Sequence, residues 1–100
     1  MDYQVVLTSR ARADLRAIAT YIARNDAVAA LRFTGRLLDH AKALNRTPFR
    51  GSPVRQRTGV RRILHSPYLI YYRVEEDSPL IRVLRFWHGA RDPKKLRFDG

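Results

Sequence analysis

Apolar residues recur at helical spacing in the first half of the chain. Two stretches carry apolar side chains three and four residues apart, which is the spacing of one face of an α-helix. The first stripe consists of Ala11, Leu15, Ile18, Ala19 and Ile22, and the second of Ala30, Phe33, Leu37, Ala41 and Leu44. The pattern predicts two amphipathic helices, one reaching about Arg24 and the other ending near Arg46.

Polar residues mark where these helices begin. Thr8 follows a short apolar run over residues 3–7, and it predicts the N-cap of a helix whose first residue is Ser9. A strand therefore leads directly into the first helix. Asp26 predicts the N-cap of the second helix, and two helices joined by so short a turn form an antiparallel hairpin.

The second half of the chain has the composition of β-strands. Three segments are rich in β-branched, aromatic and leucine residues, and short turns at 66–67 and 76–79 separate them. These segments are Val60–His65, Tyr68–Glu75 and Leu80–His88. The connections are short enough for an antiparallel meander. The tail, residues 93–100, combines a proline with several cations, and we expect it to be irregular.

The order of these elements, β-α-α-β-β-β, predicts an α+β fold formed by a single domain over residues 1–100. The helical hairpin is expected to pack on one face of a mostly antiparallel sheet, because each apolar stripe needs a surface to cover. Alternating residues of the strand 68–75 carry bulk on both of its faces. We expect the second face to be less protected, an apolar surface edged by arginine and available to a partner.

Charge narrows the class of partner. Lysine and arginine number 20 and aspartate and glutamate 9, so the net charge is +11 and an anionic partner is expected. Most of the cations are arginines, which favour bidentate contacts with phosphates and carboxylates. The chain has no cysteine, which excludes disulfides and thiolate metal sites. With neither a signal-peptide pattern nor a membrane-spanning apolar run, we expect a cytoplasmic protein without a membrane partner.

The most basic segment lies between the helices and the strands. Residues 45–59 contain prolines and glycines that break both helix and strand, so they predict a loop. The arginines of this segment and of the strand after it are Arg46, Arg50, Arg55, Arg57, Arg61 and Arg62. They predict an electrostatic docking surface for phosphates or acidic side chains, and the alternative is a solvated loop in a chain that is basic throughout.

A second group of candidate catalytic residues consists of Arg85, His88 and Arg91. His65, at the end of another strand, is expected to lie near them. In a ribonuclease, such a histidine would move the 2′-OH proton, while Arg62, Arg85 and Arg91 would stabilise the phosphorane. A structural histidine at a strand end is the simpler interpretation, and no catalytic residue is favoured.

The remaining titratable residues predict no metal centre and no cofactor. His40 lies near Asp39 and Lys42 and is expected to be a surface residue. The histidines and acids show no metal-binding spacing, and the chain has no glycine-rich phosphate loop.

Three segments in this order resemble the ParE/RelE superfamily of toxins over residues 5–93. They are 7–15 (LTSRARADL), 68–74 (YLIYYRV) and 83–93 (VLRFWHGARDP). The resemblance implies the RelE/ParE-like fold and a toxin of a bacterial type II toxin–antitoxin system, which acts in growth arrest and plasmid stabilization. It also implies a cognate antitoxin whose acidic, amphipathic C-terminal segment folds on the toxin. Many such pairs assemble as heterotetramers.

Individual positions distinguish the two branches of this superfamily. RelE-like members cleave mRNA in the ribosome without metal, and they usually have a catalytic arginine after the aromatic residue that opens the middle strand. Here Leu69 follows Tyr68, and the ending over residues 88–92 looks like the ParE branch, which implies inhibition of DNA gyrase without catalysis. The residues expected to contact the target or partner are Arg50, Arg55, Arg57, Arg61, Arg62, Arg85, His88 and Arg91. The alternatives are an mRNA endoribonuclease and a non-catalytic nucleic-acid-binding module.

Overall fold

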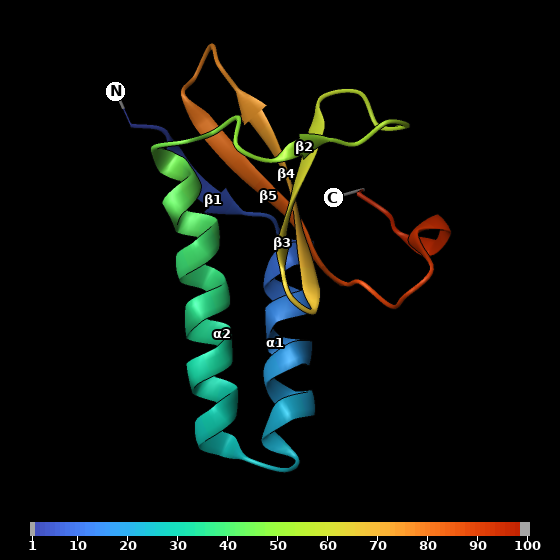
Figure 1. Ribbon diagram of the computed structural model, residues 1–100. Helices are drawn as coiled ribbons and strands as arrows, with labels where there is room; N and C mark the ends of the chain where they lie inside the picture. Colours follow the sequence, from blue (N-terminus) through green and yellow to red (C-terminus); the bar gives the residue numbers. More distant parts are fainter. Residues whose placement is uncertain (1, 99–100) are drawn as a thin grey trace.

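Two helices pack on one five-stranded sheet in the computed structural model, which describes residues 2–98 (Figure 1). The helices and strands are β1 (Gln4–Leu7), α1 (Ser9–Ala23), α2 (Ala27–Lys42), β2 (Ser52–Pro53), β3 (Val60–His65), β4 (Tyr68–Glu75) and β5 (Leu80–His88). Two short 3₁₀ helices follow α2 and β5, η1 (Ala43–Asn45) and η2 (Pro93–Lys95). The predicted α+β fold is confirmed, with β2 as an additional edge strand.

The sheet has the order β1-β5-β4-β3-β2 and is mostly antiparallel. β3, β4 and β5 form the predicted meander, and β1 pairs with β5 in parallel. Between β4 and β5 the register shifts after Tyr71, so that Leu84 has no opposite residue. This β-bulge turns Phe86 towards the helices and leaves Trp87 on the opposite face.

Both predicted N-caps are confirmed. The Thr8 hydroxyl accepts a hydrogen bond from the Ala11 N–H at 3.1 Å, and it donates to the Leu84 carbonyl at 3.2 Å. The Asp26 carboxylate accepts from the Ala29 N–H at 3.0 Å. Each cap satisfies a backbone donor that a helix start leaves without a partner, so these polar residues fix where the helices begin.

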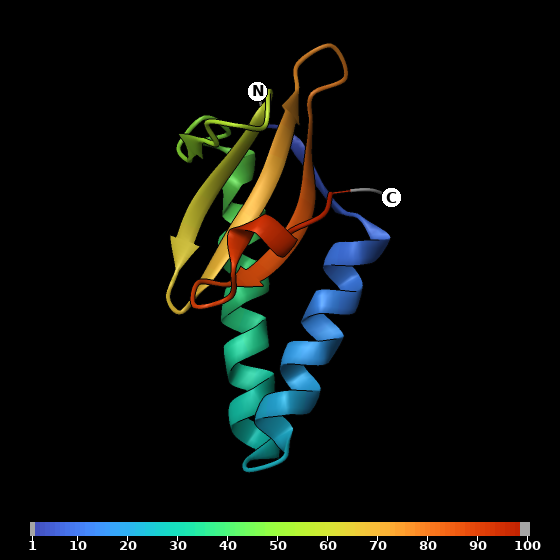
Figure 2. The same ribbon diagram turned by 90° about the vertical axis from the view of Figure 1, so that its right-hand side faces the viewer.

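The main core lies between the helical hairpin and the sheet. Figure 2 shows both helices on the same side of the strands. The buried members of this core are Ala11, Ile18, Leu37, Ala41, Ile70, Val83 and Phe86. Four of them come from the two predicted apolar stripes, which confirms that each stripe faces the sheet.

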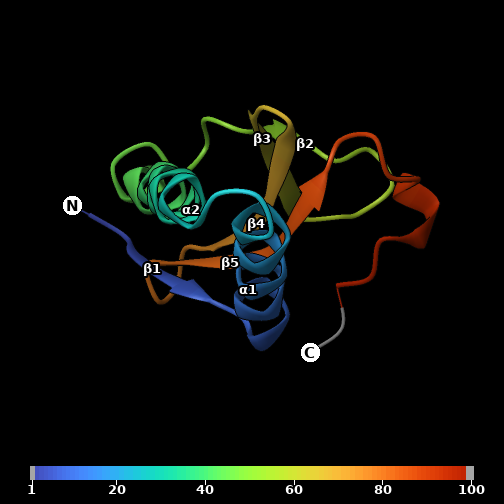
Figure 3. The same cartoon turned by 90° about the horizontal axis from the view of Figure 1, so that it is seen from below.

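The opposite face of the sheet is better covered than the sequence indicated. Tyr71 and Trp87 lie on this face, and each is only 2% exposed. The tail covers them, with Leu96 buried and Phe98 packed alongside. Figures 2 and 3 show the tail (red segment) on the side of the sheet away from α2. Within the described residues the tail is irregular apart from the single turn η2, and it contributes apolar side chains to the fold. Residues 99 and 100 of the expected tail lie outside the described residues.

The helical hairpin extends beyond the ends of the strands, past the turn that joins β3 and β4, as Figure 1 shows. Three large apolar side chains of the hairpin are exposed there: Tyr21, Val28 and Leu31. Among residues 2–98, no helix has the length and apolar character needed to cross a membrane.

Candidate functional site

Two arginines hold the tail and the loop over residues 45–59, which we call the basic loop, in place: Arg57 of the loop and Arg61 of β3. The Arg61 guanidinium lies 5.1 Å from the Phe49 ring and donates a hydrogen bond to the Gly51 carbonyl at 2.7 Å. Arg57 donates to the Leu96 carbonyl at 3.2 Å and lies 5.0 Å from the Phe98 ring. These contacts give both side chains a structural role, whereas the sequence predicted that both would contact a partner.

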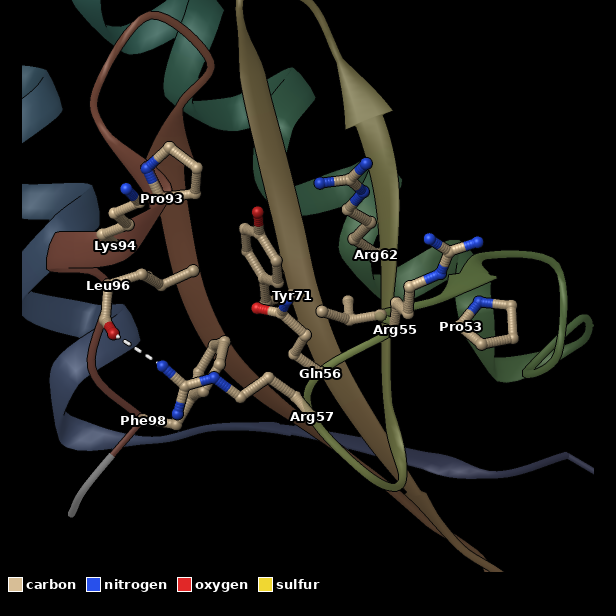
Figure 4. Close-up of a pocket in the computed structure, with 11 residues that line it drawn as sticks. Pro53, Arg55, Gln56, Arg57, Arg62, Tyr71, Pro93, Lys94, Leu96 and Phe98 are labelled. Carbon is tan, nitrogen blue, oxygen red and sulfur yellow. Dashed lines mark hydrogen bonds between the residues drawn. The ribbon is translucent and has the colours of Figure 1, made fainter.

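A pocket of about 430 Å³ lies between the loop and the tail, on the face of the sheet opposite the helices. Its lining residues are Pro53, Val54, Arg55, Gln56, Arg57, Arg62, Tyr71, Pro93, Lys94, Leu96 and Phe98. Figure 4 shows Tyr71 between Arg62 on one side and the tail residues on the other. Arg55, Arg62 and Lys94 are exposed, and none forms an ion pair with another described residue. We call this the tail pocket.

The tyrosines of β4 differ in how their hydroxyls are satisfied. The Tyr72 hydroxyl accepts a hydrogen bond from the Gly51 N–H at 2.8 Å, and burial raises the pKa of Tyr72 above its usual value. Tyr71 is 2% exposed, and its hydroxyl makes no hydrogen bond to another described residue. This hydroxyl is open to solvent, because no buried side-chain oxygen or nitrogen within residues 2–98 lacks a partner. The Tyr71 side chain lines the tail pocket.

Arg85 lies inside the fold instead of on a contact surface. Its guanidinium donates two hydrogen bonds to the Asp14 carboxylate, at 2.8 and 3.0 Å, and a third to the Arg97 carbonyl at 2.8 Å. Asp14 also accepts from the Phe86 N–H at 3.0 Å. With 6% of the residue exposed, Arg85 joins α1, β5 and the tail and is not available to a target.

His88 and Arg91 line a separate groove of about 350 Å³ beside α1. The other residues of this groove are Asp14, Ala17, Ile18, Tyr21, Tyr68 and Phe86. The His88 Nδ1 atom accepts a hydrogen bond from the Ala90 N–H at 3.0 Å, and the Arg91 guanidinium lies 3.9 Å from the Trp87 ring. The structure therefore places Arg62, in the tail pocket, apart from His88 and Arg91, and the four residues considered for a ribonuclease line no common pocket.

His65 contacts His40 and not His88. The Nδ1 atoms of His40 and His65 lie 2.9 Å apart, which joins α2 to β3. His40 is only partly exposed, so the expectation of a simple surface residue is wrong. Its position three residues after Leu37 continues the buried side of α2, and that spacing was the signal in the sequence. Desolvation lowers the pKa of His40, and electrostatic interactions with His65 and Arg50 lower it further.

This histidine contact predicts a pH dependence of stability. In the unfolded chain His40 has its ordinary pKa of 6.5, and in the folded chain its pKa is lower. Above pH 6.5 both states are neutral at His40, so the contribution is fully present. As the pH falls below 6.5, the unfolded chain binds a proton that the folded chain does not, and stability is lost until the folded pKa is reached.

We expect the thermal unfolding midpoint to fall between pH 7.5 and pH 5.5 more steeply for the natural chain than for His40→Gln. Calorimetry of both proteins over this range makes the measurement, because titration of the other groups is common to the two. Parallel curves would show that the His40 contact does not carry the effect.

No cluster of three or more histidine, aspartate or glutamate side chains that could hold a metal ion occurs in the described part of the chain.

Comparison with known proteins gives one family and several relatives. The model of the family described as "ParE toxin of type II toxin-antitoxin system, parDE" matches residues 5–93. The toxin RelE2 of Caulobacter vibrioides is 40% identical over 90 residues, which are 88% of this chain and 97% of that protein. The crystal structure of the RelBE2 toxin–antitoxin complex of Mycobacterium tuberculosis includes a chain with 26% identity and a TM-score of 0.69, covering 88% of this chain and 99% of the other. A chain of the chromosomal ParDE system of P. aeruginosa has 25% identity and a TM-score of 0.74, covering 86% and 95%.

Proposed function

The chain belongs to the family of ParE toxins of type II toxin–antitoxin systems, and on this premise we propose that it inhibits DNA gyrase by binding and is silenced by a cognate antitoxin. The observation that carries the proposal is the dispersal of the candidate catalytic residues. Arg85 is held by Asp14, while Arg62 and His88 lie in different pockets. Metal-independent RNA cleavage needs a proton-transfer group and cations around one phosphate, and this dispersal favours binding over cleavage.

The position after the aromatic residue that opens β4 supports the same choice. RelE-like ribonucleases usually have an arginine there, and this chain has Leu69, which packs with the core on the tail side of the sheet. The relatives are named both ParE and RelE, so their names do not choose between the two targets. The choice of DNA gyrase is supported by the dispersal of the candidate catalytic residues and by the ParE-like sequence over residues 88–92. The second candidate, an mRNA endoribonuclease, would require a rearranged site.

We infer that the antitoxin binds the exposed end of the helical hairpin. Tyr21, Val28 and Leu31 are 66%, 58% and 76% exposed, which offers apolar area for an amphipathic segment. The net charge of +11 favours an acidic partner, because opposite charge speeds association. The two similar structures belong to toxin–antitoxin systems, and the RelBE2 structure is a toxin–antitoxin complex, which agrees with a partner of this kind. We propose that it binds the toxin in the cytoplasm.

A parallel assay tests the proposal. The purified toxin is added to DNA gyrase in a supercoiling reaction and to translating ribosomes carrying mRNA, each with the natural chain and with His88→Ala. We expect supercoiling to stop while mRNA stays intact, and the antitoxin to restore supercoiling. Cleavage of mRNA that disappears in His88→Ala would contradict the proposal and identify an enzyme.

A further inference from the structure

The side of α2 that faces away from the sheet carries a second set of apolar residues, which we call the outer stripe. It consists of Val28, Leu31 and Leu38 with Gly35 between the leucines, because residues three, four and seven apart share one side of a helix. Val28 and Leu31 are largely exposed, and Leu38 belongs to no core cluster of the described residues. Figures 1 and 2 show only α1 beside the N-terminal half of α2, beyond the ends of the strands.

Gly35 lies in the middle of the outer stripe. A Cβ atom there would meet nothing within 4 Å, so the fold itself does not require glycine at this position. Glycine is also unfavourable inside a helix, because it loses more conformational freedom on folding than alanine does. A glycine on an exposed helix allows the backbone of another helix to approach closely. Gly35, flanked by Leu31 and Leu38, therefore indicates a crossing point with another helix.

The charged residues beside the outer stripe are arranged symmetrically about Gly35. Arg32 lies three positions before Gly35 and Asp39 four positions after it, on the same edge of the stripe. Both are exposed, and neither forms an ion pair with another described residue. In an antiparallel crossing of two α2 helices at Gly35, Arg32 of each copy lies opposite Asp39 of the other. Leu31 lies opposite Leu38 along the other edge.

This symmetry identifies the partner of the outer stripe as a second copy of the chain. In a two-fold dimer each contact occurs twice, and Arg32 with Asp39 meets that condition in the antiparallel orientation. A parallel crossing would place Arg32 against Arg32 and Asp39 against Asp39, and like charges repel. The stripe is therefore complementary to itself in one orientation.

We propose that the toxin, in the absence of its antitoxin, forms a symmetric dimer in which the two α2 helices cross antiparallel at Gly35. The leucines form the centre, and the exposed ion pairs fix the orientation more than the affinity. One helix face is a small interface, so we expect a dissociation constant on the order of 100 µM. Val28 and Leu31 also belong to the surface inferred for the antitoxin, so the dimer and the antitoxin complex exclude each other. The inference goes beyond the proposed function and does not depend on gyrase.

The net charge gives such a dimer a characteristic salt dependence. Two copies of a chain with a charge of +11 repel each other, and salt screens this repulsion. Raising the salt from about 50 to about 300 mM should therefore strengthen the association of two copies. Binding of an acidic protein would weaken over the same range. The sign of the salt effect distinguishes the two kinds of partner.

Sedimentation equilibrium of the full chain without antitoxin, from about 5 to about 500 µM, measures the association. Asp39→Arg places a positive charge opposite Arg32 of the other copy. Glu76→Arg makes the same change of net charge in the exposed turn between β4 and β5, so it is the matched control. The double variant Arg32→Asp with Asp39→Arg exchanges the two charges, which restores the pairs and keeps the natural net charge.

We expect Asp39→Arg to weaken dimerisation on the order of tenfold, and Glu76→Arg by less than about threefold. The double variant should return to within about twofold of the natural chain, because the two charges act as a pair. Gly35→Gln, which fills the crossing point, should leave the chain monomeric. Urea unfolding at low concentration confirms that each variant is folded, and the gyrase assay is read separately.

Three results would overturn the proposal. A monomer at every concentration excludes the dimer, and if Gly35→Gln then weakens binding of the antitoxin, the outer stripe belongs to the antitoxin instead. Equal losses in Asp39→Arg and Glu76→Arg would report net charge and not a contact. Association that the double variant does not recover would show that Arg32 and Asp39 do not face each other.

Discussion

Asp14→Ala is expected to lower the free energy of unfolding by about 3–5 kcal/mol, because it removes one partner of a buried ion pair. The side chains of Arg85 and Asp14 are 7% and 15% exposed, and the Arg85 guanidinium donates twice to the carboxylate. Truncation leaves a buried guanidinium charge without compensation and the Phe86 N–H without its acceptor. A domain of this size is stable by roughly 5–15 kcal/mol, so urea unfolding should show a large shift of the midpoint.

Two further variants separate the buried pair from charge in general. Asp39→Ala removes an exposed carboxylate from α2, and we expect a change within about 0.5 kcal/mol. The double variant Asp14→Leu with Arg85→Met replaces the pair by apolar side chains and should recover much of the loss. A decrease below about 1 kcal/mol for Asp14→Ala would show that Arg85 finds another partner or reaches solvent.

The sequence predicts the helices and the three long strands well because their signals are local. Thr8 and Asp26 cap helices that begin one residue later, and the segments expected as β3, β4 and β5 have the observed bounds. Apolar spacing also shows which side of each helix is buried. The family resemblance is confirmed for the same reason, since its motifs lie on these elements.

Contacts between distant segments could not be predicted in this way. Asp14 and Arg85 are separated by 71 residues, and each has the appearance of a surface charge in its own helix or strand. His40 and His65 are separated by 25 residues and meet only because α2 lies against β3. β2 contains two residues and a proline, so it carries no strand pattern. The spacing of apolar residues indicates which side of a helix or strand is buried. It does not indicate which residue of another segment lies against that side.

The contacts of individual arginines at the candidate site could not be predicted from the sequence either. The sequence identified the arginines of the loop as a group, but the structure divides them by their contacts. Arg57 and Arg61 bind backbone carbonyls, whereas Arg55 and Arg62 remain exposed at the tail pocket. Core packing was the expected role of Tyr71, and the structure places its side chain both in the core and in the lining of the tail pocket.

Gly51→Ala is the second large effect, and we expect it to lower the free energy of unfolding by about 1–3 kcal/mol. A Cβ atom at Gly51 would lie 2.6 Å from the Tyr72 hydroxyl and 2.7 Å from the Arg62 carbonyl oxygen. The carbonyl is backbone of β3 and Tyr72 is fully buried, so neither can move freely. The loop must shift, which also weakens the hydrogen bond from the Gly51 N–H to Tyr72.

Gly35→Ala is the matched control, with the opposite sign expected. Gly35 lies within α2, and a Cβ atom there meets nothing within 4 Å. Alanine favours the helix over glycine by about 0.5–1 kcal/mol, so urea unfolding should show a more stable protein. If Gly51→Ala were also stabilising, the basic loop could not lie against Tyr72 and β3 as described.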